Sequence, residues 1–215
     1  MNTNIKPFYI YTDRNYLYIK NINESAERLA GNIYAYSANI DDDNNIHIVG
    51  IDTLGRVIHF FNKDGIWKKK IIRKYFNSAR NIKDMRLYIL NDYFNVFIAE
   101  KYPLDDNLYK ISHLNFTPLN YNVCRHTIDK VFEDNSSIYK LNIDELSNIV
   151  FQYKTIDILS RDIGDNVIIF NSISRRWLTS TPLLRSKQVY INEQNISSNI
   201  KNDIFEYCYS IKYKL

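Results

Sequence analysis

Glycine, proline and cysteine are all scarce in this sequence. Its 215 residues include 5 glycines, 4 prolines and 2 cysteines. Cys124 and Cys208 are too few for a disulfide framework, and the chain has neither a glycine-rich phosphate loop nor a nucleophile elbow. These absences exclude disulfide-stabilised scaffolds, P-loop nucleotide binders and enzymes built on the nucleophile elbow.

Long apolar runs are absent as well. No run approaches the length of a membrane span, and the first twenty residues alternate apolar with polar residues instead of forming the apolar core of a signal peptide. We therefore expect a cytoplasmic protein with no membrane partner. The formal net charge is only +4, which permits an acidic partner without demanding one, and we do not expect nucleic-acid binding.

Residues that favour β-strands dominate the remainder of the chain. Apolar residues make up 45% of the whole chain. They include 18 tyrosines and 11 phenylalanines, which suit half-buried strands. Apolar and polar residues alternate with a period of two almost throughout, and the only helix we predict is Glu24–Ala30. The predicted strands are Phe8–Tyr11, Tyr16–Lys20, Ile33–Ala38, Ile46–Ile51, Arg56–Phe61, Trp67–Lys74, Arg86–Leu90, Val96–Glu100, Leu108–Leu114, Ile138–Ile143, Ile149–Lys154, Val167–Asn171, Trp177–Thr181, Val189–Ile191 and Ile204–Tyr209.

A short turn signature recurs along the chain. The segments Ile40–Ile46, Leu90–Val96 and Ile143–Ile149 align without gaps as an apolar residue, two polar residues, two free positions, Asn, and then Ile or Val. Weaker copies lie at Tyr11–Tyr16 and Ile191–Ile196. The clear copies are about 50 residues apart. The three clear and two weak copies together give a mean of roughly 43 residues per unit, which is the length of a four-stranded propeller blade.

The central repeat carries a resemblance to known proteins. The runs Asp43–Val49, Gly55–Phe60 and Asp64–Trp67 together resemble one blade of the five-bladed β-propellers in uncharacterised clostridial-type bacterial proteins. They are similar, more loosely, to the tachylectin-type lectin propellers. The glycine signatures of kelch and WD40 blades are absent. The repeat and the resemblance lead us to expect an all-β protein whose residues 1–215 form a single propeller domain.

We expect five blades, each a four-stranded antiparallel sheet, and this architecture allows the terminal blades to be incomplete. In one version of this architecture the terminal strands join into one blade and close the ring. In the other, the chain is a piece of a longer protein. Closure is favoured because an open blade would leave unpaired strand edges.

Four residues are candidates for ligand binding, each with a purely structural alternative. His47 and His59 lie on successive predicted strands and are expected to be neighbours, most simply as a paired set of surface histidines. Trp67 and Trp177 recur at one blade position, where an indole could stack on a sugar ring, although packing is the simpler interpretation. Cys124 and His126 share a strand face, but a buried thiol is expected there. No metal site or cofactor is predicted.

Charged segments offer two further alternatives. The acidic turns at Asp41–Asp43, Asp105–Asp106 and Asp144–Glu145 resemble paired carboxylates, but they lack the spacing of a calcium loop and are interpreted as turn residues. The basic stretch Trp67–Tyr75 could bind phosphate or an acidic partner. A simpler interpretation is that its lysines protect the outer edge of a blade from aggregation.

These observations favour a binding protein over an enzyme. We predict a non-enzymatic binding or scaffold module, a rigid platform for a protein or glycan partner, because no set of catalytic residues is visible. The alternative is a glycoside hydrolase-like enzyme in which carboxylates from separate blades meet in the central funnel.

Overall fold

The computed structural model describes residues 8–21, 24–63, 65–105, 107–133, 137–157, 161–179 and 206–207. In these residues every paired strand is antiparallel, and the only helix is the three-residue 3-10 turn η1 (Ala79–Asn81). The expected all-β class is confirmed. No helix among them is long and apolar enough to cross a membrane. The predicted strand Val189–Ile191 and the weak repeat Ile191–Ile196 lie outside the described residues.

The first sheet contains strands from both ends of the chain. Its order is β16-β1-β2-β3. The predicted helix at Glu24–Ala30 is wrong, because its second half is β3, which pairs with β2. The open edge of β2 offers backbone hydrogen bonds that outweigh a weak local helix preference. The four strands are β16 (Glu206–Tyr207), β1 (Phe8–Asp13), β2 (Tyr16–Asn21) and β3 (Glu27–Ala30).

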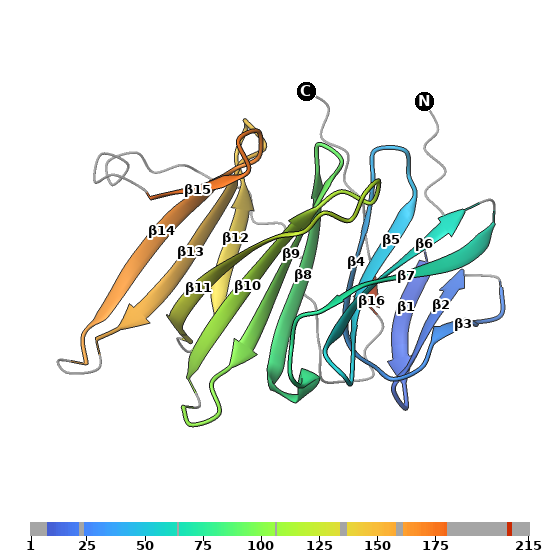
Figure 1. Cartoon of the computed structure of the whole chain (residues 1–215), viewed down its shortest axis with the longest axis horizontal. Helices are drawn as coiled ribbons and strands as arrows, with labels where there is room; N and C mark the ends of the chain where they lie inside the picture. Colours follow the sequence, from blue (N-terminus) through green and yellow to red (C-terminus); the bar gives the residue numbers. More distant parts are fainter. Residues whose placement is uncertain are drawn as a thin grey trace.

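The second sheet is the four-stranded antiparallel unit predicted for one blade. Its order β4-β5-β6-β7 follows the chain, so β4 and β7 are its two edges. β7 is the strand that runs across the front of the molecule in Figure 1. The strands are β4 (Ile33–Ile40), β5 (Ile46–Asp52), β6 (Arg56–Lys63) and β7 (Ile66–Lys74).

The third sheet has eight strands and contains two further four-stranded units. These units, β8 to β11 and β12 to β15, are joined where Val131 and Phe132 of β11 pair with Thr155 and Lys154 of β13. β11 was not among the predicted strands. The eight are β8 (Ile82–Leu90), β9 (Tyr93–Lys101), β10 (Leu108–Phe116), β11 (Cys124–Phe132), β12 (Tyr139–Ile143), β13 (Ile149–Ile156), β14 (Ile163–Asn171) and β15 (Arg176–Thr179).

Successive units lie side by side, as blades do in a propeller-type fold (Figure 1). The first strands of the second and third units are tied together: Ser37 Oγ accepts from the Leu87 amide at 3.0 Å, and Asn39 donates to the Leu87 carbonyl at 3.0 Å. The pairing of β16 with β1 also brings a strand near the C-terminus beside the first strand. The count of five blades and the closure of the ring stay predictions.

The repeated turn has two different structures. Asp41 Oδ1 accepts the amides of residues 43 and 45 at 3.0 and 2.7 Å, and Asp144 Oδ1 accepts those of residues 146 and 148 at 2.9 and 2.7 Å. The copy at Leu90–Val96 instead turns at Asn91 and Asp92, both of which have positive φ. Because these two residues tolerate that conformation, β9 begins earlier and Asn95 lies inside it.

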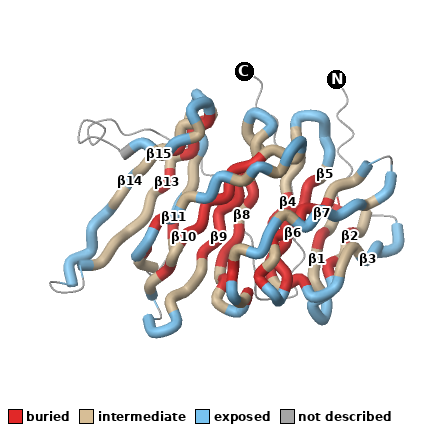
Figure 2. The backbone as a smooth tube through the Cα atoms, in the orientation of Figure 1, coloured by how far each residue is buried: buried red, intermediate tan, exposed pale blue. Residues whose placement is uncertain are grey.

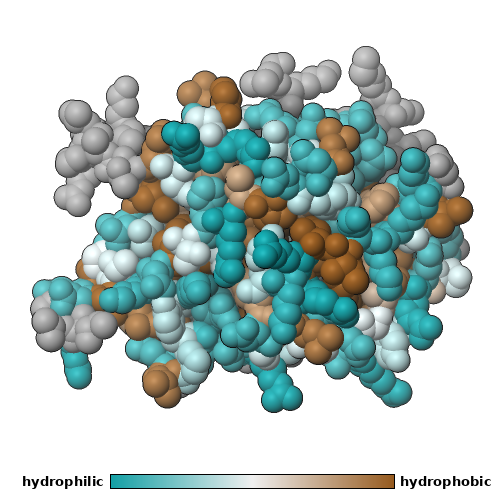
Figure 3. All heavy atoms as spheres, in the orientation of Figure 1, coloured by the Kyte–Doolittle hydropathy of each residue, from teal (hydrophilic) through white to brown (hydrophobic). Residues whose placement is uncertain are grey.

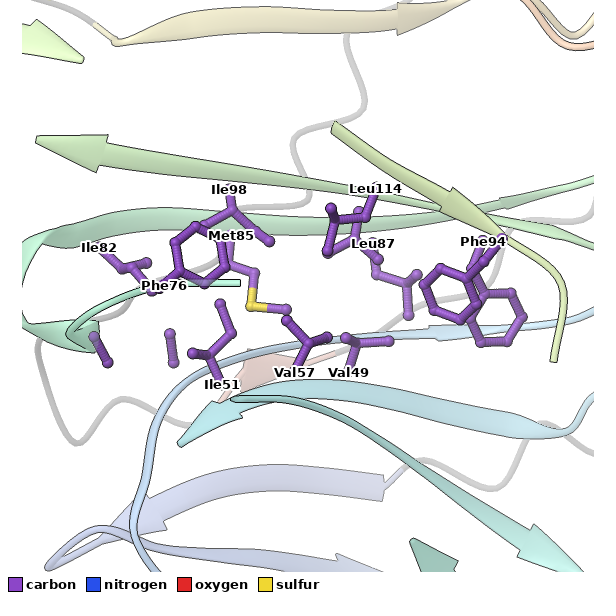
Figure 4. Packing of buried hydrophobic residues seen from close by; sticks show 14 residues of the cluster. Val49, Ile51, Val57, Phe76, Ile82, Met85, Leu87, Phe94, Ile98 and Leu114 are labelled. Carbon is purple, nitrogen blue, oxygen red and sulfur yellow. The ribbon is translucent and has the colours of Figure 1, made fainter. Parts of the chain in front are cut away.

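Alternation along the strands builds a core on each side of a blade. Ile48 of β5 packs towards the first sheet, whereas Val49 packs towards the third. Buried residues accordingly concentrate along the middle strands, and the turns and β7 are exposed (Figure 2). Figure 4 shows the cluster between the second and third sheets, where Met85 of β8 lies among aliphatic side chains such as Val57 and Ile51 of the facing strands.

Substitution of Gly55 tests the turn between β5 and β6. Its φ is +79°, and a Cβ there would lie 2.0 Å from the Phe76 carbonyl oxygen. Gly55→Ala should therefore lower the free energy of unfolding by more than about 2 kcal/mol, since strain and a backbone clash combine. Gly65→Ala is the matched control, because its φ is also +79° but no atom lies within 4 Å. It should cost about 1 kcal/mol in urea unfolding, and equal losses would show that the clash is unimportant.

Candidate functional site

His47 and His59 belong to a continuous chain of four hydrogen-bonded side chains. His47 Nε2 is 3.0 Å from Asp41 Oδ2, His47 Nδ1 is 3.0 Å from His59 Nε2, and His59 Nδ1 is 2.9 Å from the Tyr121 hydroxyl. One proton arrangement satisfies every link: Tyr121 donates to His59, His59 donates to His47, and His47 donates to the Asp41 carboxylate. We call these residues the Asp41 relay.

The sheet register explains why the two histidines meet. Val49 of β5 lies opposite His59 of β6, so His47 is the diagonal neighbour of His59 on the same face. They are neighbours, as predicted, but they are not surface residues: His59 is 1% exposed and His47 is 9% exposed. The ring of Phe94, from β9, stands edge-on against both imidazoles and shields them from water.

Burial fixes the protonation states in the relay. It lowers the pKa of His59 to about 3, with a smaller contribution from the charge of His47. Burial likewise raises the pKa of Tyr121 above its usual value. Burial acts to raise the pKa of Asp41, but hydrogen bonds from Asn45 and His47 outweigh it and the pKa is lowered. At neutral pH the relay therefore supplies fixed hydrogen bonds to an ionised carboxylate, and His59 is too weakly basic to activate a nucleophile.

A pocket of about 310 Å³ opens between the first two sheets, next to the relay. Asp41 Oδ2 accepts the side-chain amide of Asn45 at 2.9 Å, so the relay holds the turn that forms one pocket wall. Trp67 contributes another wall and packs on the buried cluster between these sheets. The described residues that line it are Ile19, Asn21, Glu24, Ser25, Glu27, Asn44, Asn45, Ile46, Asn62 and Trp67.

The pocket lining combines one aromatic face with many hydrogen-bonding groups. Its described residues supply four side-chain amides, two carboxylates and one hydroxyl, and none of them is a lysine or arginine. Asn21 donates to Glu24 Oε2 at 2.5 Å, and Asn62 Oδ1 accepts the Gly65 amide at 3.0 Å, which orients both amides. The arrangement can bind a polar ligand that also presents an apolar face.

Trp177 occupies the corresponding place in β15 but has different surroundings. It lies opposite Phe170 and within 6.2 Å, ring centre to ring centre, of Phe97, His113 and Phe151. Its Nε1 is buried without a hydrogen-bond partner among the residues described. Trp67 and Trp177 are therefore not brought together, and Trp177 is part of an aromatic core.

A network between the third and fourth units was not predicted. Arg175, in the turn before β15, donates to Asn115 Oδ1 at 2.7 Å and lies 4.5 Å from the Tyr93 ring centre. Asn115 in turn donates to Asn95 Oδ1 at 2.9 Å. The same oxygen of Asn95 lies 3.1 Å from His113 Nε2. The repeated Asn of the turn signature was the only sequence signal for it.

Carboxylates are sparse on the strands that would face a central funnel. The first strands of the second, third and fourth units, β4, β8 and β12, contain a single acid, Asp84. Its Oδ2 is 2.9 Å from Arg86 Nε. In the described ranges no three His, Cys, Asp or Glu side chains are grouped to hold a metal. Cys124 is exposed, so the expected buried thiol is wrong.

Lowering the pH tests the buried histidine of the relay. The pKa of His59 is depressed from 6.5 to about 3, so the unfolded chain binds a proton in that range and the folded chain does not. Stability from this group is fully present above pH 6.5 and is lost as the pH falls towards 3. At pH 5 the loss should be about 2 kcal/mol. Urea unfolding at pH 7 and pH 5 measures it.

His59→Gln is the control for that experiment. Gln does not titrate, so the loss between pH 7 and pH 5 should shrink by about 2 kcal/mol. His113, whose pKa burial also lowers, accounts for part of the remaining loss. An unchanged pH dependence in the variant would contradict the assignment to His59.

Comparisons with known proteins add matches of fold only. No family model matches the chain, and no curated protein matches it. A GH43 endo-arabinanase from Bacillus licheniformis matches with a TM-score of 0.44 and 12% identity, over 80% of this chain and 73% of that one. A bifunctional GH43-CE protein from Bacteroides eggerthii matches with a TM-score of 0.43 and 8% identity, over 81% of this chain. The chain spans 26% of that protein.

These matches change two expectations. The prediction that the chain is not an enzyme is contradicted, because the matching structures are of enzymes of the GH43 type, and it is withdrawn. The propeller-type arrangement rests on the sheet topology, and no comparison supports the resemblance to clostridial proteins. At these TM-scores and identities they assign neither a substrate nor a reaction to this chain.

Proposed function

We propose that this protein binds a saccharide in the pocket at Trp67. The observation that carries the proposal is an indole wall facing several side-chain amides and carboxylates in one concave site. A sugar ring has an apolar face that stacks on an aromatic ring and an equatorial belt of hydroxyls that need hydrogen-bond partners. The pocket volume of about 310 Å³ is within the range of small-molecule sites.

In this proposal the relay has a positioning role. His47 contacts Asp41, His59 contacts His47, and neither lines the pocket; through Asp41 they keep Asn44 and Asn45 in place as a pocket wall. Trp177 contributes to the core and not to the ligand site. We further propose the five-bladed ring as the architecture, supported by the four units described and by the β16–β1 pairing.

Replacing Trp67 tests saccharide binding. Trp67→Ala should weaken binding of any sugar found on a glycan array by about 10-fold to 100-fold, because stacking is lost. Trp67→Phe should retain part of the affinity, since it keeps an aromatic face. Leu104→Ala is the control, because Leu104 is fully exposed and does not line the pocket. Calorimetry with the array hit gives the affinities, and absence of any hit would refute the proposal.

Hydrolysis of a glycosidic bond is the second candidate function. Glu24 and Glu27 line the same pocket, and a pair of carboxylates is the usual minimum for this chemistry. Glu24 lies in the connection between β2 and β3 and Glu27 begins β3, so both belong to one unit, unlike the predicted acids from separate blades. The substrate of this reaction would be the same saccharide that the first proposal places in the pocket.

Neutral variants of the two glutamates separate hydrolysis from binding. Glu24→Gln and Glu27→Gln keep hydrogen-bonding capacity but cannot act as acid, base or nucleophile. If the pocket is catalytic, each variant should reduce release of reducing sugar by at least about 100-fold while calorimetric affinity changes little. No release by the unmodified protein from any bound oligosaccharide would leave binding as the function and reject hydrolysis.

A further inference from the structure

The outer strand of the second sheet, β7, carries an unusual set of exposed side chains. β7 is the last strand in the order β4-β5-β6-β7, so one of its edges is unpaired within the described residues. We call its exposed residues the basic edge. They are Ile66, Lys68, Lys69, Lys70, Ile71, Arg73 and Lys74.

The basic edge concentrates positive charge. It carries five cations and no acid within nine residues, whereas the whole chain has a formal net charge of only +4. None of the five forms an ion pair with a carboxylate in the part of the chain that is described. Lys70 Nζ lies 6.0 Å from the Tyr121 ring centre. The charges therefore remain available to an anionic partner.

Aliphatic side chains are interspersed with these cations. Ile66 is 64% exposed and Ile71 is 46% exposed. Figure 3 shows the face across which β7 runs, where hydrophobic groups lie among a mainly hydrophilic surface. An exposed isoleucine adds nothing to binding of a phosphate backbone or an acidic polysaccharide, because neither offers an apolar surface to cover it. A lipid surface offers both anionic headgroups and apolar chains.

The choice of cation agrees with a lipid partner. Four of the five cations are lysines. A lysine acts as a point charge and suits a diffuse anionic surface, whereas an arginine suits a single phosphate or carboxylate that it binds through two hydrogen bonds. Edge lysines also prevent strands from associating, but that function does not need exposed isoleucines, which favour association. The combination supplies both contributions to peripheral membrane binding, which are attraction to anionic lipid and burial of apolar side chains.

We propose that the basic edge binds peripherally to an anionic lipid surface. The lysines and Arg73 contact headgroups, and Ile66 and Ile71 insert at the boundary between headgroups and chains. We expected no membrane partner because the sequence lacks a span, but a peripheral contact needs none. The contact uses side chains of β7 other than Trp67, none of which lines the pocket, so it does not depend on saccharide binding.

Vesicle co-sedimentation tests the electrostatic part. The chain should bind vesicles containing phosphatidylserine, not vesicles of phosphatidylcholine alone, and added salt should release it. The triple variant Lys68→Gln, Lys69→Gln and Lys70→Gln should bind about 100-fold more weakly. The matched control, Lys130→Gln with Lys140→Gln and Arg161→Gln, removes the same charge from exposed residues elsewhere and should bind within about threefold of the parent.

The isoleucines decide whether the partner is lipid. Ile66→Ser with Ile71→Ser leaves every charge in place and alters only exposed side chains, so the fold should be unaffected in thermal unfolding. It should weaken vesicle binding by about 10-fold and leave binding to heparin or duplex DNA unchanged. If the double variant binds vesicles like the parent, or if only heparin or DNA is bound, the proposal is overturned.

Discussion

The ionised carboxylate of Asp41 is the group on which the candidate site depends. One oxygen closes the turn between β4 and β5 by accepting two backbone amides, and the other accepts from Asn45 and from His47. The same carboxylate therefore fixes the turn, accepts the hydrogen bond of the buried histidine pair, and holds Asn45 in the pocket wall. A buried neutral histidine is costly unless its nitrogens are bonded, and Asp41 supplies the end of the hydrogen-bonded chain.

Local patterns in the sequence predicted the class of fold but not its exceptions. Alternation identified most strands because it reports which face of a strand is buried. It missed β3, where pairing with β2 overrides the local preference of Glu27–Ala30, and it missed β11, whose burial is irregular. The repeat at Leu90–Val96 aligned correctly in sequence, yet it forms a different turn, since Asn91 and Asp92 can adopt the tighter one.

The candidate site was only half visible in the sequence. Spacing predicted that His47 and His59 are neighbours, but Tyr121 from the loop between β10 and β11 and Phe94 from β9 turn a surface pair into a buried relay. Trp67 and Trp177 share a position in their blades, and what surrounds each one sets its role. Trp67 lies beside the amides of adjoining turns, whereas Trp177 is enclosed by rings from β9, β10, β13 and β14. Such long-range neighbours are not encoded in local spacing.

The pairing of β16 with β1 has a consequence for how the chain is made. β16 follows β1 by most of the described chain, so it leaves the ribosome long after β1. The first sheet therefore remains incomplete until β16 has been synthesised, with one edge of β1 open during that interval. Contacts of such high sequence separation form slowly and expose unpaired edges while they wait. The first sheet is thus completed only after the strands of the second and third sheets have been made, and it is the sheet most dependent on protection during translation.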